Sequence, residues 1–537
     1  MERRDFLKAV GSTALASSMA GPLFAQGTAR KQNVIIFICD QWSYGTTKAQ
    51  GFPLDTMPTL DRLQQSGVGF QRNYCTIPLC VPSRISMLTG RWPDAHRVRM
   101  NLDAKDAFFE KDIYQVAKAA GYRTALVGKN HTYLNKNHVD TWIEYFHGGG
   151  PDGPGTSQAD KDFDRWLTGR HFNVSDEPTP FPVTRELPYR IVSDAMGVID
   201  QAGDTPFFIQ VSLPEPHNPE QVPHPYWNMF PPESVPDRCA GPEALPRLGQ
   251  RLQWEYRMQQ DVAPQTEKLW RRYRSNYFGM LRLIDDQIKR LMEHLKAKGL
   301  VDDTVIVFTS DHGDALMNFG LGHKGLGVRE TVTHTPMIWH GPGIRNRPEL
   351  AQAFTSMADL MPTLCEVMGQ PIPHGVQGRS LLPLLRGENY PHDEFRSIYT
   401  SCGVGGLYYE DKDKVPLSAG QGPGPMFDEL NMVTMSGNQK MVRMGDWKLV
   451  YDMMGYGQLY DLSRDPCELT NLFGQPQYEK EQSSLMAELA MWAIRVQDSL
   501  PTGPQNRKYQ TKWPAASDHN WYAPYRHGGS APNNYIP

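Results

Sequence analysis

Val34-Ile35-Ile36-Phe37-Ile38-Cys39-Asp40 is an unbroken apolar run that ends in a carboxylate. Three further apolar runs follow along the chain, at 124–127, 207–213 and 304–308. Continuous apolar runs, rather than alternating ones, are typical of strands in a parallel sheet that is covered on both faces. We therefore predict four strands of a buried, mostly parallel sheet.

Helical patterns lie between these runs. Residues 57–66, 110–120 and 276–298 have helical periodicity, and each stretch is followed by a glycine, which is a common helix stop. Strands that alternate with helices predict an α/β fold, here a large, mostly parallel sheet sandwiched by helices. In such folds the ligand binds beyond the carboxyl ends of the strands.

Polar side chains follow each of the four apolar runs. The residues concerned are Asp40, Lys129 with His131, His217, and Asp311 with His312. Because the carboxyl ends of parallel strands meet at one edge of a sheet, we expect these side chains to converge on one polar site.

The composition of the chain changes after about residue 390. Residues 398–450 are rich in glycine and contain short strand-like pieces, and a helical pattern follows at about 479–497. We predict a smaller C-terminal domain, residues 391–500, of antiparallel sheet plus one helix, after a catalytic α/β domain at 27–390. Residues 501–537 form an extended tail in this interpretation.

The first 26 residues are typical of a targeting segment. Arg3-Arg4-Asp5-Phe6-Leu7-Lys8 resembles a twin-arginine motif, and a weakly apolar stretch rich in Ala and Ser follows it. That stretch is too short and too polar to anchor as a membrane helix, and no later stretch approaches membrane-spanning length. We expect export by the twin-arginine machinery to the periplasm or outside the cell.

Charge and cysteine content exclude other classes. The net charge of −4 does not suit a nucleic-acid binder, which shows a basic patch or stripe. The seven cysteines are an odd number without repeated spacing or a C-x-x-C pair, so they predict neither a disulfide scaffold nor a zinc site. Cys39 and Cys365 lie in apolar surroundings that are typical of core residues.

Cys80 lies in the most specific segment of the chain. Cys80-Val81-Pro82-Ser83-Arg84, followed by Leu88-Thr89-Gly90-Arg91, resembles the signature of the sulfatase family of the alkaline phosphatase superfamily. Further matches follow in the family's order: Gly121-Tyr122-Arg123-Thr124 with Gly128-Lys129-Asn130-His131, Ser310-Asp311-His312-Gly313-Asp314, Gln377-Gly378-Arg379-Ser380-Leu381, and Leu459-Tyr460-Asp461-Leu462 with Asp465-Pro466. The resemblance spans about residues 30–500.

The resemblance implies that Cys80 is oxidised to formylglycine by a formylglycine-generating enzyme before folding. A hydrated aldehyde has two hydroxyls: one attacks sulfur and expels the alcohol, and the other is then deprotonated and ejects sulfate, which divides one hard step into two. Pro82 suits the first turn of a helix, which would place residue 80 at a helix N-terminus. We expect free N–H groups and the helix dipole there to favour an anionic sulfate.

The resemblance also implies a divalent metal. Its ligands would be Asp40, Asp311 and His312, completed by an oxygen of the modified Cys80. Oxygen ligands on loops suit Ca²⁺, whereas an imidazole is more typical of Mn²⁺ or Zn²⁺, so Ca²⁺ is the first choice and Mn²⁺ the alternative. Gln41 stands where the family often has a second Asp, and its amide oxygen could still coordinate.

The same resemblance assigns the remaining catalytic roles. Lys129 and Lys324 would clamp the sulfate, and Arg84 would orient the formylglycine hydroxyl. His131 would help to deprotonate the remaining hydroxyl, and His217 would protonate the leaving group. The histidines without motif support are assigned to surface, capping or substrate-loop positions; they are His96, His138, His147, His224, His340, His374 and His392.

Three functions remain open from the sequence. The first is hydrolysis of a sulfate monoester on a small molecule or glycan, with carbohydrate sulfates favoured because the protein is expected to be exported. The second is a phosphonate monoester or phosphodiester hydrolase, since Asp40-Gln41-Trp42 and Asp311-His312 resemble that branch equally well. The third is a sulfatase-like binding protein without catalysis, in which Cys80 remains a thiol.

Overall fold

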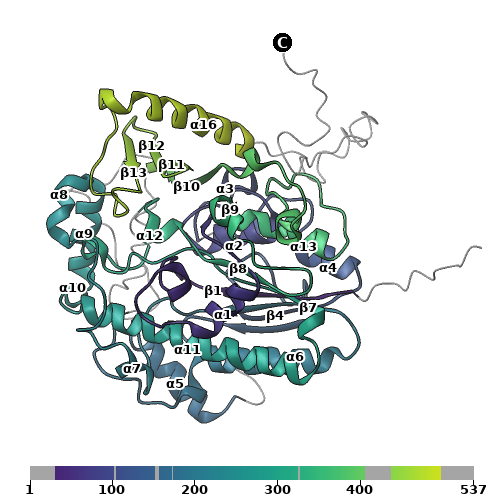
Figure 1. The fold of residues 1–537 in the computed structure, drawn as a ribbon. Coiled ribbons are helices and arrows are strands. Elements are labelled where there is room, and N and C mark those ends of the chain that lie inside the picture. The colour runs from purple at the N-terminus through teal and green to yellow at the C-terminus, as the bar shows by residue number, and fades with distance from the viewer. Residues whose placement is uncertain are drawn as a thin grey trace, which may run out of the picture. The chain divides into compact units, whose positions relative to one another are not determined.

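The computed structural model describes residues 31–101, 104–151, 156–171, 173–324, 327–405 and 437–497 (Figure 1). The predicted signal segment at 1–26 and the predicted tail at 501–537 lie outside the described residues. The described residues from Gln32 onward form one compact unit. The domain boundary near residue 390 stays a prediction.

A seven-stranded sheet forms the centre of this unit. Its strand order is β2 (Val68–Phe70), β8 (Met337–His340), β7 (Thr304–Ser310), β1 (Asn33–Cys39), β6 (Phe207–Leu213), β4 (Arg123–Lys129) and β5 (Thr141–Tyr145). The five strands from β7 to β5 are mutually parallel, whereas β8 runs antiparallel to both β7 and β2. The predicted large, mostly parallel sheet is confirmed.

Helices cover both faces of this sheet. Val34, Ile36 and Ile38 of β1 pack with α2 (Cys80–Thr89), α4 (Ile113–Ala119), α13 (Leu360–Val367) and α14 (Leu382–Arg386). Ile35, Phe37 and Cys39 point to the opposite face and pack with α1 (Pro58–Ser66), α5 (Gln158–Thr168), α6 (Leu187–Ala202) and α11 (Trp270–Ala297). Successive strand residues face opposite sides, so every residue of β1 is buried and the apolar run is continuous.

Short elements connect these layers. These elements include the helices α3 (Pro93–His96), α7 (Tyr226–Met229), α8 (Leu245–Leu248), α9 (Gln250–Val262), α10 (Gln265–Lys268) and α12 (Glu330–Thr333). β3 (Arg72–Tyr74) and β9 (Phe354–Ser356) form a separate parallel pair. None of the described helices has the length and apolar character needed to cross a membrane.

The second sheet is antiparallel and lies near the C-terminus. Its order is β10 (Ser397–Gly405), β11 (Gly437–Met444), β12 (Trp447–Asp452) and β13 (Gly457–Asp461), and α16 (Glu479–Gln497) packs against it. Trp492 of α16 is fully buried in a core with Ile398, Met441 and Leu449. The predicted smaller sheet with one helix is confirmed.

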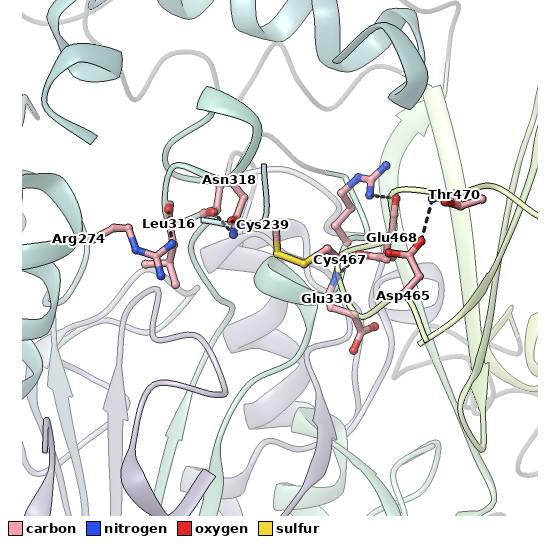
Figure 2. Close-up of a disulfide and its surroundings, with 11 residues drawn as sticks. Cys239, Arg274, Leu316, Asn318, Glu330, Asp465, Cys467, Glu468 and Thr470 are labelled. Carbon is pink, nitrogen blue, oxygen red and sulfur yellow. Dashed lines mark hydrogen bonds between the residues drawn. A yellow bond between two sulfur atoms is a disulfide. The ribbon is translucent and has the colours of Figure 1, made fainter. Parts of the chain in front are cut away.

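A disulfide links the two sheet regions (Figure 2). Cys239 precedes α8 and Cys467 follows β13; their Cα atoms lie 5.8 Å apart, at a sequence separation of 228. The Cys239 N–H donates to Asn318 Oδ1 at 2.8 Å, and the Glu468 carbonyl accepts from Arg329 at 2.8 Å. The chain is no disulfide scaffold, since the other five cysteines, all within the described residues, form no disulfide, but the spacing of the cysteines did not predict this one bond.

Candidate active site

The carboxyl ends of the parallel strands bring the predicted site residues together. Asp40 follows β1, Lys129 ends β4, and Asp311 with His312 follows β7. Cys39 pairs in register with both Ser310 and Leu213, so β1, β6 and β7 end at one level. The expected convergence on one edge of the sheet is therefore present.

Cys80 is the first residue of α2, and the helix start is fixed to the end of β7. The Ser83 hydroxyl donates to the Asp311 carbonyl at 2.6 Å. The expectation of free N–H groups at this helix end is wrong, however. The Val81 N–H donates to Asn101 Oδ1 at 3.0 Å, and the Ser83 N–H donates to the Leu79 carbonyl at 3.1 Å. Pro82 has no N–H, so α2 offers mainly its dipole, and donors for an anion must come from side chains.

Arg84 ties two carboxylates together inside the protein. Its Nε donates to Asp311 Oδ2 at 2.7 Å, and a terminal nitrogen contacts Asp40 Oδ2 at 3.3 Å, with all three side chains fully buried. The guanidinium also donates to the Ser212 hydroxyl at 2.8 Å. Buried charges need such pairing, and the rigid fork of Arg suits two acceptors at once.

The other oxygens of these carboxylates face Cys80 and His312. Asp40 Oδ1 lies 3.6 Å from Cys80 Sγ and 3.5 Å from His312 Nε2, and His312 Nε2 lies 3.1 Å from Cys80 Sγ. Asp311 Oδ1 lies 3.7 Å from the same imidazole nitrogen. All four ligand atoms fall within 4.8 Å of one another, as a metal site requires. Gln41 Oε1 is buried nearby and has no hydrogen-bond partner among the described residues.

The electrostatics of the cluster suit a cation. Burial alone would raise the pKa of Asp311, but the His312 ring, which is charged only at acidic pH, and the charges of Arg84 and Lys129 hold that pKa well below its usual range. Burial lowers the pKa of His312 to about 3, so its imidazole is neutral and Nε2 can act as a ligand. Its other nitrogen, Nδ1, donates to the Gly313 carbonyl at 3.0 Å, which fixes the ring. Ionised carboxylates and a neutral imidazole are the forms that bind metals.

Lys129 lies between a carboxylate and an imidazole. Its Nζ donates to Asp40 Oδ2 and lies 2.6 Å from His147 Nε2. An ammonium can only donate, so Nε2 of His147 must be the acceptor and the imidazole is neutral. His147 thus holds the Lys129 ammonium without cancelling its charge.

Lys324 contacts the imidazole of His217 in the same way as Lys129 contacts that of His147. Lys324 Nζ lies 2.9 Å from His217 Nε2, and His217 Nδ1 donates to the Asn218 carbonyl at 2.9 Å. Burial and the neighbouring charges of Lys324 and Lys129 place the pKa of His217 well below its ordinary value. His217 is therefore neutral, and the transferable proton of this pair resides on Lys324.

The two lysine–imidazole pairs are stacked on each other. The rings of His147 and His217 have centroids 3.9 Å apart and an interplanar angle of 30°. His131 completes the group, with its ring edge-on to His147 at 5.3 Å. All nine predicted site residues therefore belong to one connected group at the sheet edge.

From the sequence, His147 is assigned to a surface, capping or substrate-loop position. The structure instead places it in the site, between Lys129 and His217. His147 follows β5, a fifth parallel strand that the apolar pattern does not reveal because four of its five residues are only partly buried. Recognition of β5 in the sequence would have identified His147, because it lies two residues beyond the end of that strand, as Asp40 and Asp311 lie one residue beyond the ends of theirs.

A parallel α/β sheet with a buried carboxylate–imidazole cluster and two lysines at its carboxyl edge defines a hydrolase that acts on anionic esters. A model of the Sulfatase family matches residues 32–370, and the chain belongs to this family. A choline-sulfatase of Rhizobium meliloti is 27% identical over 528 residues, covering 90% of this chain and 91% of the relative.

Two solved structures share the fold. A phosphonate monoester hydrolase from Silicibacter pomeroyi superposes with a TM-score of 0.69 at 23% identity, covering 88% of this chain and 97% of that one. A 2-O GAG sulfatase superposes with a TM-score of 0.66 at 19% identity, covering 87% and 93%. At these identities the likeness shows the fold alone.

Proposed function

We propose that this chain hydrolyses a sulfate monoester at the cluster around Cys80. The observation that carries the proposal is the position of Cys80 Sγ, which lies 3.6 Å from Asp40 Oδ1 and 3.1 Å from His312 Nε2. Lysines 129 and 324 lie in the same connected group. A reacting group among side chains that could hold a metal ion, with two lysines in the same group, suits a tetrahedral anionic ester that must lose an alcohol.

The residues fit a divalent cation held by Asp40, Asp311, His312 and an oxygen of the modified Cys80. The carboxylates support this because each gives one oxygen to Arg84 and presents the other to the cluster. Gln41 is a further candidate ligand, because its Oε1 is buried without a hydrogen-bond partner among the described residues and its backbone N–H donates to Asp311 Oδ1. Mostly oxygen donors favour Ca²⁺, with Mn²⁺ as the alternative that the imidazole would accept.

Formylglycine made from Cys80 would supply a hydrate, one hydroxyl of which attacks sulfur while the other is later deprotonated to release sulfate. The remaining work falls to this chain's own side chains. Lys129 and Lys324 bind the sulfuryl oxygens. Lys324 keeps its positive charge for the anion because its partner His217 is neutral, whereas Lys129 is shared between Asp40, His147 and the anion. Arg84 holds Asp40 and Asp311 in position.

Proton transfer is assigned to the histidines and Lys324. The Lys324–His217 pair shares one transferable proton, and we assign it the protonation of the leaving alkoxide. His131 is assigned the removal of the proton that triggers sulfate release. This division follows the sequence resemblance, and the contact between Lys324 and His217 supports it.

A phosphonate monoester or phosphodiester hydrolase is the second candidate. Gln41 beside Asp40, together with His312, is the feature that favours it, and a phosphonate monoester hydrolase shares the fold. Parallel assays on the sulfate and phosphate esters of one alcohol separate the candidates. A large kcat/KM advantage for the phosphodiester or phosphonate would refute the sulfatase assignment.

The decisive experiment examines Cys80 itself. Full-length protein produced together with a formylglycine-generating enzyme should show, by peptide mass spectrometry, a mass at residue 80 that corresponds to the aldehyde. Cys80→Ala should abolish hydrolysis of sulfate esters, while Cys365→Ala, which alters another buried cysteine, should retain it. Active protein with a free thiol at residue 80, or full activity of Cys80→Ala, would contradict the mechanism. Binding without turnover by protein in which Cys80 stays a thiol despite co-production would indicate the non-catalytic alternative.

Export is part of the proposal. The twin-arginine pattern at the N-terminus supports passage through that machinery to the periplasm or beyond. The disulfide between Cys239 and Cys467 supports it independently, because disulfides persist mainly in oxidising compartments. Fusion of residues 1–40 to a reporter, with Arg3→Lys/Arg4→Lys as the control, tests the signal.

A further inference from the structure

The segment of residues 315–323, which leads directly into Lys324, has an unusual backbone conformation. We call it the lysine segment. Four of its non-glycine residues have positive φ angles, at 52°, 59°, 60° and 59°: Leu316, Met317, Phe319 and His323. Bulky side chains rarely adopt this left-handed region because it brings Cβ too close to the backbone. Such a conformation persists only where contacts with the surrounding structure hold it.

The lysine segment is closed on itself and filled by one side chain. The Ala315 N–H donates to the His323 carbonyl at 2.6 Å, which joins the two ends. Gln259 of α9, with 1% of its surface exposed, donates from Nε2 to the Gly320 carbonyl at 2.6 Å and accepts from the Gly322 N–H at 3.0 Å. Because these bonds fix its shape, the position of the segment depends on what anchors it from outside.

Tyr273 of α11 anchors the lysine segment to the turn that carries the metal cluster. Its hydroxyl accepts from the His323 N–H at 3.2 Å and donates to Asp314 Oδ2 at 2.8 Å. Gln41 Nε2 donates to the same carboxylate oxygen at 2.6 Å. Tyr273 is fully buried, so its hydroxyl has a fixed position. One oxygen atom therefore sets the distance between the backbone next to Lys324 and the polar turn after β7.

α11 reinforces this anchor with two neighbouring side chains. Tyr277 lies one helical turn after Tyr273, and its hydroxyl accepts from the Ser43 N–H at 3.0 Å and donates to the Gln41 carbonyl at 2.8 Å. Arg274 donates to the carbonyl of Leu316, in the lysine segment, at 3.2 Å (Figure 2). The same helix thus contacts the turn after β1 and the lysine segment.

We infer that Tyr273 is a positioning residue for proton transfer by Lys324. The inference rests on the proposed function, in which Lys324 and His217, 2.9 Å apart, protonate the leaving alkoxide. Tyr273 acts through the backbone of His323 and through Asp314. Without the hydroxyl, the lysine segment loses its bond to the metal turn, and the Lys324 ammonium meets the leaving oxygen less often.

The test measures how the loss of this hydroxyl depends on the leaving group. Tyr273→Phe removes one oxygen atom and keeps the ring, in full-length enzyme produced together with a formylglycine-generating enzyme. Loss of one hydrogen bond predicts about a tenfold fall in kcat/KM for phenyl sulfate. The fall for 4-nitrophenyl sulfate should be only about twofold, because a good leaving group needs little protonation. A purely structural role would lower both values alike.

Tyr399→Phe is the matched control. Tyr399 is also fully buried, and its hydroxyl donates to a carboxylate, Asp94 Oδ2, at 3.0 Å, but it lies in β10 of the C-terminal sheet. This variant should change the ratio of the two kcat/KM values by less than about twofold, since the bond that it removes lies outside the site. Gln259→Met removes the two bonds inside the lysine segment and should alter that ratio in the same direction as Tyr273→Phe.

Two results would overturn the inference: equal losses for the two esters in Tyr273→Phe, or a kcat/KM for phenyl sulfate that matches wild type. Failure of the proposed function has a different signature. Wild-type enzyme would then hydrolyse neither sulfate ester. The same dependence on the leaving group with phenyl and 4-nitrophenyl phosphonates would in that case leave the role of Tyr273 standing.

Discussion

Replacement of His147 by Ala tests whether neutral imidazoles hold the lysines of the site. The substitution removes the acceptor 2.6 Å from Lys129 Nζ and the ring that stacks on His217 at 3.9 Å. A hydrogen bond to a charged group contributes about 1.5–3 kcal/mol, and a ring stack about 0.5–1.5 kcal/mol. Together they predict a loss of about 2–4.5 kcal/mol in transition-state binding, which is roughly a 30- to 2,000-fold fall in kcat/KM.

Two companion variants separate the contributions. His147→Gln keeps an acceptor near the position of Nε2 and should lose only about tenfold in kcat/KM, because only the ring stack is removed. His147→Glu should be worse than Ala, since a carboxylate would neutralise the Lys129 ammonium that binds sulfate. His392→Ala, on the surface, is the control.

The assay is steady-state hydrolysis of a sulfate ester, with inhibition by inorganic sulfate measured alongside. Weaker inhibition by sulfate in the Ala and Glu variants would show that Lys129 has lost its position or charge. A His147→Ala enzyme within threefold of wild type in kcat/KM, or a Glu variant as active as Gln, would refute this reasoning.

Three further predictions concern the metal, the buried acids and the disulfide. Removal of the metal with a chelator should abolish hydrolysis yet leave the protein folded, because Arg84 still pairs with the buried negative charge of Asp40. Addition of Ca²⁺ or Mn²⁺ should restore activity, and persistent activity after verified metal loss would count against a metal role. Burial raises the pKa of Glu186 to about 8, so the folded state retains a proton that the unfolded chain loses above about pH 4.5. The unfolding free energy should therefore fall between pH 5 and 8 by up to about 1.4 kcal/mol per pH unit. Glu186→Gln should flatten this pH dependence in thermal unfolding, and an unaltered slope would contradict the prediction. Cys239→Ser/Cys467→Ser should lower the unfolding free energy by about 2–5 kcal/mol in denaturant titrations, and no change would mean that the bond constrains little.

Much of the fold could be predicted because the central strands are buried on both faces. β1, β4, β6 and β7 carry continuous apolar runs, and the side chain that ends each run indicates the site edge. β5 escaped prediction because an edge strand is half solvated and has a weaker pattern, and His147 was missed with it.

Contacts between distant segments were the other limit. The pairing of Cys239 with Cys467 depends on how two loops 228 positions apart meet, which no local pattern records. The hydrogen bond from Val81 to Asn101 likewise removes a helix-end donor that a helix pattern alone leaves free.

The near-complete burial of Cys80 sets an order of events in the life of this chain. With 1% of its surface exposed, its sulfur is out of reach of any other protein once α2 has packed against the end of β7. An enzyme that converts this residue must therefore work on the nascent or unfolded polypeptide. The Cys239–Cys467 bond, in contrast, joins segments 228 residues apart in sequence, so it forms only once folding has brought these segments together, later than any such conversion of Cys80.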